Sequence, residues 1–258
     1  MIVFNESKEG LFGSSLNWIN ARLPYLYKNK IYPSWDIRNV NHGDVADKNR
    51  IIPHIIKPKQ EDTASTERVN LLDIDRYQYT DFEEANFYFN HYFKFDQSII
   101  DLSSEICEPF NNCLGIHFRG NDKSRKNDKE NIPIDNEAYI KKIKLFAEKH
   151  DFESVFVLSD EIALKEFLKY EISDAFDRPV FFTDLKPVFH LSQKSLKNKL
   201  ELTKNSVAEM LVLSKCKYVL KNQSAFSSWA KIVNPKIKMY RTSKCKQDWF
   251  PDYYLPEL

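Results

Sequence analysis

The stretch LGIHFRGNDK, residues 114–123, joins the end of an expected strand to a charged loop. The apolar run CLGIHF at 113–118 predicts a buried strand, and Arg119, Asp122 and Lys123 follow it. A guanidinium offers paired donors that match phosphate oxygens, and a lysine adds a point charge. The cluster therefore fits the binding of a phosphate-bearing ligand, and it fits a surface loop of salt bridges equally well.

The second half of the sequence alternates between strand patterns and helix patterns. Apolar runs predict strands at 113–118, 154–160, 178–183, 217–220 and 236–240. Helical spacing predicts helices at 135–150, 161–170, 206–216 and 224–233, with Asp135 as the cap of the first. Such alternation is typical of a parallel sheet with helices on both faces, so the expected fold class is α/β. Ligands of these sheets bind at the carboxyl ends of the strands.

Two further polar groups lie at such positions. Asp160 and Glu161 end one expected strand, where they fit the binding of ribose or acceptor hydroxyls, or proton abstraction. The alternative is that Asp160 caps the next helix and Glu161 is a first-turn acid. Hydroxyl and amide side chains at 221–235 open a later helix, where Ser224 and the backbone N–H groups would form an anion site.

The first half of the sequence carries weaker patterns. A helix from about Ser14 is expected to end or kink at Pro24. The other expected elements are strands at 2–4 and 31–35, a loop at 40–75 and a helix at 81–93. We therefore predict an N-terminal α/β domain, residues 1–110, and a Rossmann-like domain, residues 111–258.

Composition excludes several classes of protein. The net charge of +1 is not the basic excess usual for nucleic-acid-binding proteins. The four cysteines form no CxxC pair, and no short Cys/His cluster is typical of a zinc site. The first residues lack a signal-peptide pattern, and no apolar run approaches the roughly 20 residues of a membrane span. We expect a reduced, cytoplasmic protein whose lysine-rich segment at 186–204 contacts solvent or, alternatively, an acidic membrane surface.

Several ordered patches resemble the superfamily of α-1,2-, α-1,6- and protein O-fucosyltransferases. HFRGNDK at 117–123 is similar to the HxRR-D motif, and VFVLSDE at 155–161 is similar to the F-SDD strand and turn. EMLVLSKCKYVLKNQSAFSSWAKIVNP at 209–235 resembles the α-1,2 segment with LMS-C, N-S-S-F-S-W-W and N-P. GLFGSSLNWINA at 10–21 resembles the N-terminal glycine loop, and DWFPDYYLPEL at 248–258 resembles the family's end.

The resemblance implies a GT-B architecture, with two Rossmann-like domains facing across a cleft and the N-terminal domain on the acceptor side. It also implies an inverting, metal-independent transfer of fucose from GDP-fucose to a glycan, such as a bacterial lipopolysaccharide or surface-polysaccharide intermediate, or a lipid-linked glycan. By the same resemblance, Arg119 holds the donor diphosphate, and His117 and Glu209 lie near the guanine. The other expected donor-site residues are Gly13, Asp122, Lys123, Asp160 and Ser224.

Glu209 also has a chemical argument for this role. A carboxylate accepts both the N1–H and the 2-amino group of guanine. Glu209 falls near the start of the helix expected at 206–216, where the helix dipole favours an ionised acid. The alternative is an exposed first-turn acid.

Three departures from the family pattern leave the linkage, the acceptor and the donor sugar open. Gly120 stands where the motif has its second arginine, and Ala225 and Ser228 replace a serine and a tryptophan. Another nucleotide sugar or a non-catalytic binding protein therefore stays an alternative. Arg119 and Lys123 would assist the leaving diphosphate. The candidates for the general base are Asp122, Asp128, Glu130 and Glu161.

Overall fold

The structure is a computed structural model that describes residues 1–8, 10–79, 81–106, 112–120, 135–183, 185, 198–244 and 252–258. The chain divides into two compact units: unit 1 is Met1–Leu102 with Leu191–Val207, and unit 2 is Ser103–His190 with Ala208–Leu258. The division falls within α4 (Gln97–Ile106) and α7 (Lys199–Leu213). The boundary expected after residue 110 lies outside the described residues.

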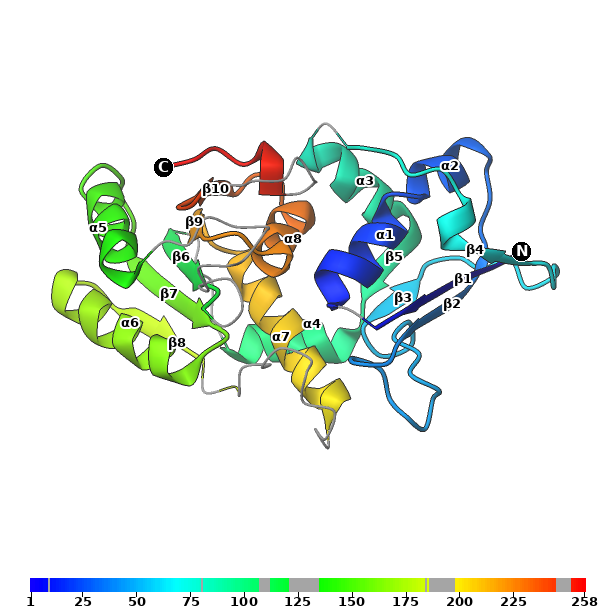
Figure 1. Ribbon diagram of the computed structural model, residues 1–258, viewed down its shortest axis with the longest axis horizontal. Helices are drawn as coiled ribbons and strands as arrows, with labels where there is room; N and C mark the ends of the chain where they lie inside the picture. Colours follow the sequence, from blue (N-terminus) through cyan, green and yellow to red (C-terminus); the bar gives the residue numbers. More distant parts are fainter. Residues whose placement is uncertain are drawn as a thin grey trace. The chain divides into compact units, whose positions relative to one another are not determined.

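Unit 1 is built on a three-stranded parallel sheet of order β2-β1-β4 (Figure 1). Its strands are β1 (Ile2–Ser7), β2 (Ser34–Asn39) and β4 (Arg68–Asn70), and β3 (Ile56–Pro58) pairs antiparallel with β5 (Phe93–Phe95). Its helical segments are η1 (Leu11–Leu16, a π-helix), α1 (Asn17–Asn20), α2 (Leu23–Lys28), η2 (Leu71–Asp73) and α3 (Phe82–Tyr92). Val3 and Ile37 are completely buried, whereas Phe4 and Arg38 on the other face are partly exposed.

The sequence patterns of unit 1 are partly confirmed. The break at Pro24 is confirmed, because α1 ends at Asn20 and Pro24 lies in the first turn of α2. The loop expected at 40–75 is wrong in part, because it contains β3, β4 and η2. Elements of three residues are too short to show a periodic pattern.

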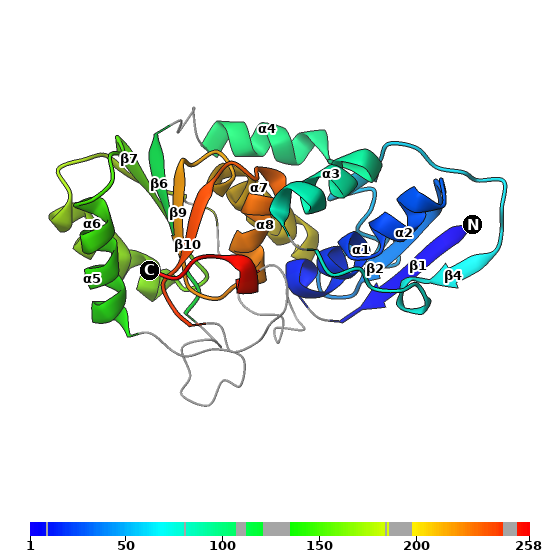
Figure 2. The same cartoon turned by 90° about the horizontal axis from the view of Figure 1, so that it is seen from above.

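Unit 2 is built on a five-stranded parallel sheet of order β10-β9-β6-β7-β8 (Figure 2). Its strands are β6 (Cys113–Phe118), β7 (Ser154–Ser159), β8 (Val180–Phe182), β9 (Tyr218–Lys221) and β10 (Lys238–Arg241). Its helical segments are α5 (Asn136–Ala147), α6 (Ile162–Ala175), α8 (Ala225–Val233), η3 (Asp252–Tyr254) and part of α7. The alternation predicted from the sequence is confirmed.

Helices cover both faces of the unit 2 sheet, with α5 and α6 on one side and α7 and α8 on the other (Figures 1 and 2). Every residue of β6 is therefore buried. α7 approaches β6 closely, since a Cβ atom at Gly115 would lie 2.9 Å from Leu213 Cδ2 and 3.1 Å from Cys216 Sγ. Asp135 caps α5 as expected, with its carboxylate accepting from the N–H of Ala138 at 2.8 Å.

In the part of the chain that the structure describes, none of the helices combines the length and the apolar composition needed to cross a membrane.

Candidate functional site

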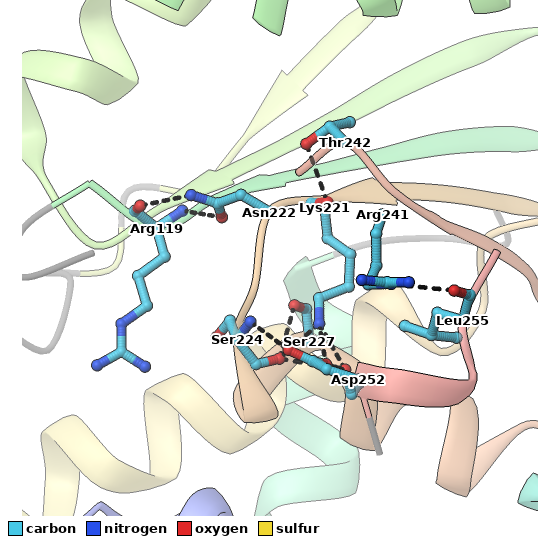
Figure 3. A network of polar contacts seen from close by, with 10 residues as sticks. Arg119, Lys221, Asn222, Ser224, Ser227, Arg241, Thr242, Asp252 and Leu255 are labelled. Atoms are coloured by element: carbon cyan, nitrogen blue, oxygen red, sulfur yellow. Dashed lines mark hydrogen bonds and ion pairs between the residues drawn. The ribbon is translucent and has the colours of Figure 1, made fainter. Parts of the chain in front are cut away.

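Arg119 leaves the carboxyl end of β6 and is held there through its main chain. Its N–H donates to Asn222 Oδ1 at 2.8 Å, and Asn222 Nδ2 donates to its carbonyl oxygen at 2.7 Å. Asn222 follows β9, which is the neighbour of β6 in the sheet. The side chain of Arg119 extends away from the Asn222 clamp (Figure 3). The fixed backbone of Arg119 would position its guanidinium to bind an anionic ligand.

Asp160 connects the ends of β7 and β6. Its Oδ1 accepts from the N–H of Gly120 at 2.8 Å. The expectation that Asp160 caps α6 is wrong, because the N-cap residue is Glu161 and makes no side-chain cap hydrogen bond. Asp160 thus bonds the loop that follows the neighbouring strand β6.

Glu161 lies over Gly120. A Cβ atom at Gly120 would lie 2.9 Å from Glu161 Cδ and 3.0 Å from its Oε2, so the carboxyl group fills the space next to this residue. Burial, followed by the charge of Asp160, raises the pKa of Glu161. Gly120, which stands where the motif that this sequence resembles has its second arginine, thus accommodates a carboxyl group.

His117 is the second-last residue of β6 and is buried, with 4% of its surface exposed. Its ring lies against Phe226, with 5.0 Å between centroids, and no described group bonds its Nδ1. Burial, together with the charges of Lys221 and Arg119, lowers its pKa well below the usual range. His117 is therefore a neutral imidazole at neutral pH, with a hydrogen-bonding atom left for a ligand or a water molecule.

Ser224 is the N-cap residue of α8, as expected for an anion site. Its Oγ is buried and has no partner among the described residues, but its N–H donates to Asp252 Oδ2 at 2.8 Å. One donor of the predicted anion site is thus already bound to a carboxylate from the end of the sequence. Sequence reasoning did not single out Lys221 or Asp252, and it included Asn222 only among the amide side chains at 221–235. For Lys221 the available signal was a lysine at the end of a buried strand.

Glu209 occupies the third turn of α7, because this helix begins at Lys199. The expectation that it lies at a helix N-terminus is therefore wrong. Its side chain accepts a hydrogen bond from the hydroxyl of Thr183, to which Lys165 Nζ also donates at 3.2 Å. Burial raises the pKa of Glu209 to about 7, opposed by Thr183 and by the charge of Lys165. A buried carboxyl group poised near neutrality is typical of functional sites.

The remaining predicted site residues lie in unit 1 or outside the described residues. Gly13 lies in the π-helix η1 of unit 1, a helix type that is frequent at functional sites. There the N–H of Leu11 donates to His42 Nε2 at 3.3 Å, which fixes the start of η1. Asp122, Lys123, Asp128 and Glu130 lie outside the described residues. Within the described residues, no group of three His, Cys, Asp or Glu side chains is placed to hold a metal ion.

Solved structures of fucosyltransferases share the fold of this chain. Fucosyltransferase NodZ from Bradyrhizobium matches with a TM-score of 0.58 at 14% identity, over 91% of this chain and 93% of NodZ. NodZ α-1,6-fucosyltransferase soaked with GDP-fucose matches with a TM-score of 0.55 over 91% and 92% of the two chains, again at 14% identity. POFUT1 in complex with GDP matches with a TM-score of 0.51 at 10% identity, over 93% and 98%.

No protein-family model matches the sequence, and no curated protein matches it. The chain therefore has the α/β, GT-B-type fold of these enzymes, and the likeness extends to the fold alone.

Proposed function

We propose that the protein is an inverting glycosyltransferase that transfers fucose from GDP-fucose to a glycan. The observation that carries this proposal is Arg119, fixed by Asn222 at the carboxyl edge of a parallel sheet. The likeness in fold to structures described with GDP-fucose and GDP supports the choice of nucleotide. The acceptor that we propose is a lipopolysaccharide or surface-polysaccharide intermediate, or a lipid-linked glycan.

In this proposal unit 2 binds the donor and unit 1 contributes the acceptor side and Gly13. Arg119 stabilises the charge of the leaving diphosphate, and Lys123 assists it. The Oγ of Ser224 and the first turn of α8 also face the diphosphate, because helix N-termini favour anions. His117, Asp160 and Glu209 bind the nucleoside, with the last accepting the donors of guanine.

The acceptor hydroxyl needs a general base. Glu161 is the candidate that lies within the described residues, and its raised pKa brings it closer to a neutral working pH. Asp122 remains a second candidate.

The nucleotide preference tests the proposal most directly. Purified protein should bind GDP at least about tenfold more tightly than UDP or ADP, because a buried acceptor left unpaired costs roughly 1–3 kcal/mol. Competition calorimetry measures the three affinities. Equal affinities would remove the GDP-sugar donor, and a preference for UDP or ADP would instead favour a transferase of the same fold with another donor.

One observation favours a second candidate, a non-catalytic nucleotide- or glycan-binding protein. Gly120 removes an arginine from the diphosphate motif, and Glu161 fills the space beside it. A measurement of turnover distinguishes the enzyme from the binding protein. Release of GDP from GDP-fucose supports the enzyme, whereas tight binding of GDP-fucose without any release supports the binding protein.

Activity should not require a divalent metal. The diphosphate of the donor is neutralised by cationic side chains in this proposal, which leaves no role for a bridging ion. The rate of GDP release should therefore be the same in excess EDTA as in untreated protein. Loss of activity with EDTA, followed by recovery on addition of Mn²⁺ or Mg²⁺, would contradict this. Asp73 and Asp75, the one DxD spacing in the sequence, would then be the first residues to replace.

A further inference from the structure

A buried ion pair lies next to the start of α8 (Figure 3). The side chains of Lys221, at the end of β9, and Asp252, in η3, are both 0% exposed. Lys221 Nζ donates to Asp252 Oδ1, to the carbonyl oxygen of Ser224 at 2.7 Å and to Ser228 Oγ. Apolar residues often replace such a pair without loss of stability, so a contribution to stability alone does not account for it.

Asp252 is bound at the positive end of α8. Its Oδ2 accepts from the N–H of Ser224 at 2.8 Å, and Ser228 Oγ donates to its Oδ1. A helix N-terminus carries about half a positive charge. An unneutralised carboxylate would cancel this charge and repel a second anion at the same helix end. The Oγ of Ser224, a residue with 2% of its surface exposed, has no partner among the described residues and points independently to a ligand there.

We infer that Lys221 is a positioning residue for the donor diphosphate: it neutralises Asp252, so that Asp252 caps α8 without cancelling the positive charge that the diphosphate needs. This inference rests on the proposed function, which places the diphosphate at that helix end. The charge of Lys221 also acts beyond its own ion pair, because it contributes to the lowered pKa of His117 at the end of β6.

The segment that carries Asp252 is fixed to the sheet by its own hydrogen bonds. Arg241, the last residue of β10, pairs in parallel with Glu257 and donates from Nε to the carbonyl oxygen of Leu255 at 3.0 Å. Its N–H donates to the carbonyl oxygen of Pro256 at 2.8 Å. These bonds hold the carboxylate at the start of α8, where it needs a permanent counter-charge.

Three variants distinguish an electrostatic role of Lys221 from a packing role. Lys221→Met keeps most of the volume and leaves Asp252 uncompensated, so GDP affinity should fall about tenfold or more. Lys221→Met/Asp252→Asn removes both charges and should return the affinity to within about threefold of wild type. Asp252→Asn leaves the lysine positive and should bind GDP no more weakly than wild type.

A packing role predicts a different result. All three variants would then weaken GDP binding in step with their loss of thermal stability, and that outcome overturns the inference. Arg22→Met is the matched control, because Arg22 is a buried cation of unit 1 that donates to the carbonyl oxygen of Leu71 at 2.7 Å. It should lower the melting temperature without changing GDP affinity.

A measurement made without ligand tests the inference independently of the proposed function. Titration of His117 by NMR should show a higher pKa in Lys221→Met, because a nearby positive charge is lost, and a return toward the wild-type pKa in the double variant. An unchanged pKa in Lys221→Met overturns the inference. Failure of the wild-type protein to bind either GDP or pyrophosphate contradicts the proposed function, whatever the titration shows.

Discussion

Arg119→Ala is expected to abolish measurable GDP binding and fucose transfer while the protein stays folded. In the proposed donor site the guanidinium would form paired, charge-assisted hydrogen bonds with the diphosphate, each contributing about 1.5–3 kcal/mol, so affinity should fall on the order of a hundredfold or more. The hydrogen bonds to Asn222 use only the main chain of residue 119, so they survive the substitution. Calorimetry measures the GDP affinity of the variant, and a thermal melt shows whether the variant stays folded.

Arg119→Lys should recover little of the lost affinity, because an ammonium group cannot form the bidentate contact. Arg178→Ala is the matched control, because Arg178 lies just before β8, at the amino edge of the sheet. Its Cζ atom lies 4.3 Å from the centroid of the Phe152 ring. It should bind GDP like the wild type. GDP affinity in Arg119→Ala equal to that of the wild-type protein would exclude Arg119 as the diphosphate ligand.

Local signals in the sequence predicted the frame of the candidate site correctly. The apolar run that forms β6 and the cap of α5 at Asp135 depend on neighbouring residues only, and both are observed. The alternation of strands and helices then places Arg119 and Asp160 at one edge of the sheet without any knowledge of contacts. The structure bears this out, because Asp160 bonds the residue next to Arg119.

The sequence patterns could not predict contacts between residues that are distant in the sequence. Asp252 bonds Ser224 across 28 residues, and nothing local distinguishes it from other acids near the end of the sequence. Asp160 had a plausible local partner in the helix that follows, and the actual partner lies 40 residues away. Long-range hydrogen bonds of this kind are set by strand order, which a single sequence does not specify.

The start of α7 shows how a boundary error changes a chemical argument. Residues 199–205, KLELTKN, are mostly polar and lack the apolar spacing of the following turns, so the helix was expected only from 206. That error placed Glu209 at the positive end of a helix and predicted a stabilised carboxylate. In the structure Glu209 is a buried acid with a raised pKa, which reverses the sign of the expected effect on stability.

Glu209→Gln should stabilise the ligand-free protein at about pH 8. The unfolded protein loses the Glu209 proton near its usual pKa of 4.5, whereas the folded protein keeps it until about pH 7. Folding stability therefore falls as pH rises from 4.5 to 7 and stays low above that range. The neutral amide avoids this loss and should gain about 1–3 kcal/mol at pH 8, with little difference below pH 4.5. Denaturant unfolding at several pH values measures this difference in the free energy of unfolding. Glu166→Gln is the control, because Glu166 is exposed.

The same substitution should remove the preference for GDP. Guanine presents two donors, and in the proposed site only the ionised carboxylate of Glu209 would accept both, whereas an amide turns one acceptor into a donor that faces them. Wild-type GDP affinity should therefore rise up to about pH 7 and level off, because GDP competes with the proton below the pKa. Competition of GDP, UDP and ADP in wild type and Glu209→Gln, at pH values on both sides of 7, measures both effects. A stabilised variant that still prefers GDP would show that Glu209 is a buried acid of the fold and that another group recognises the base.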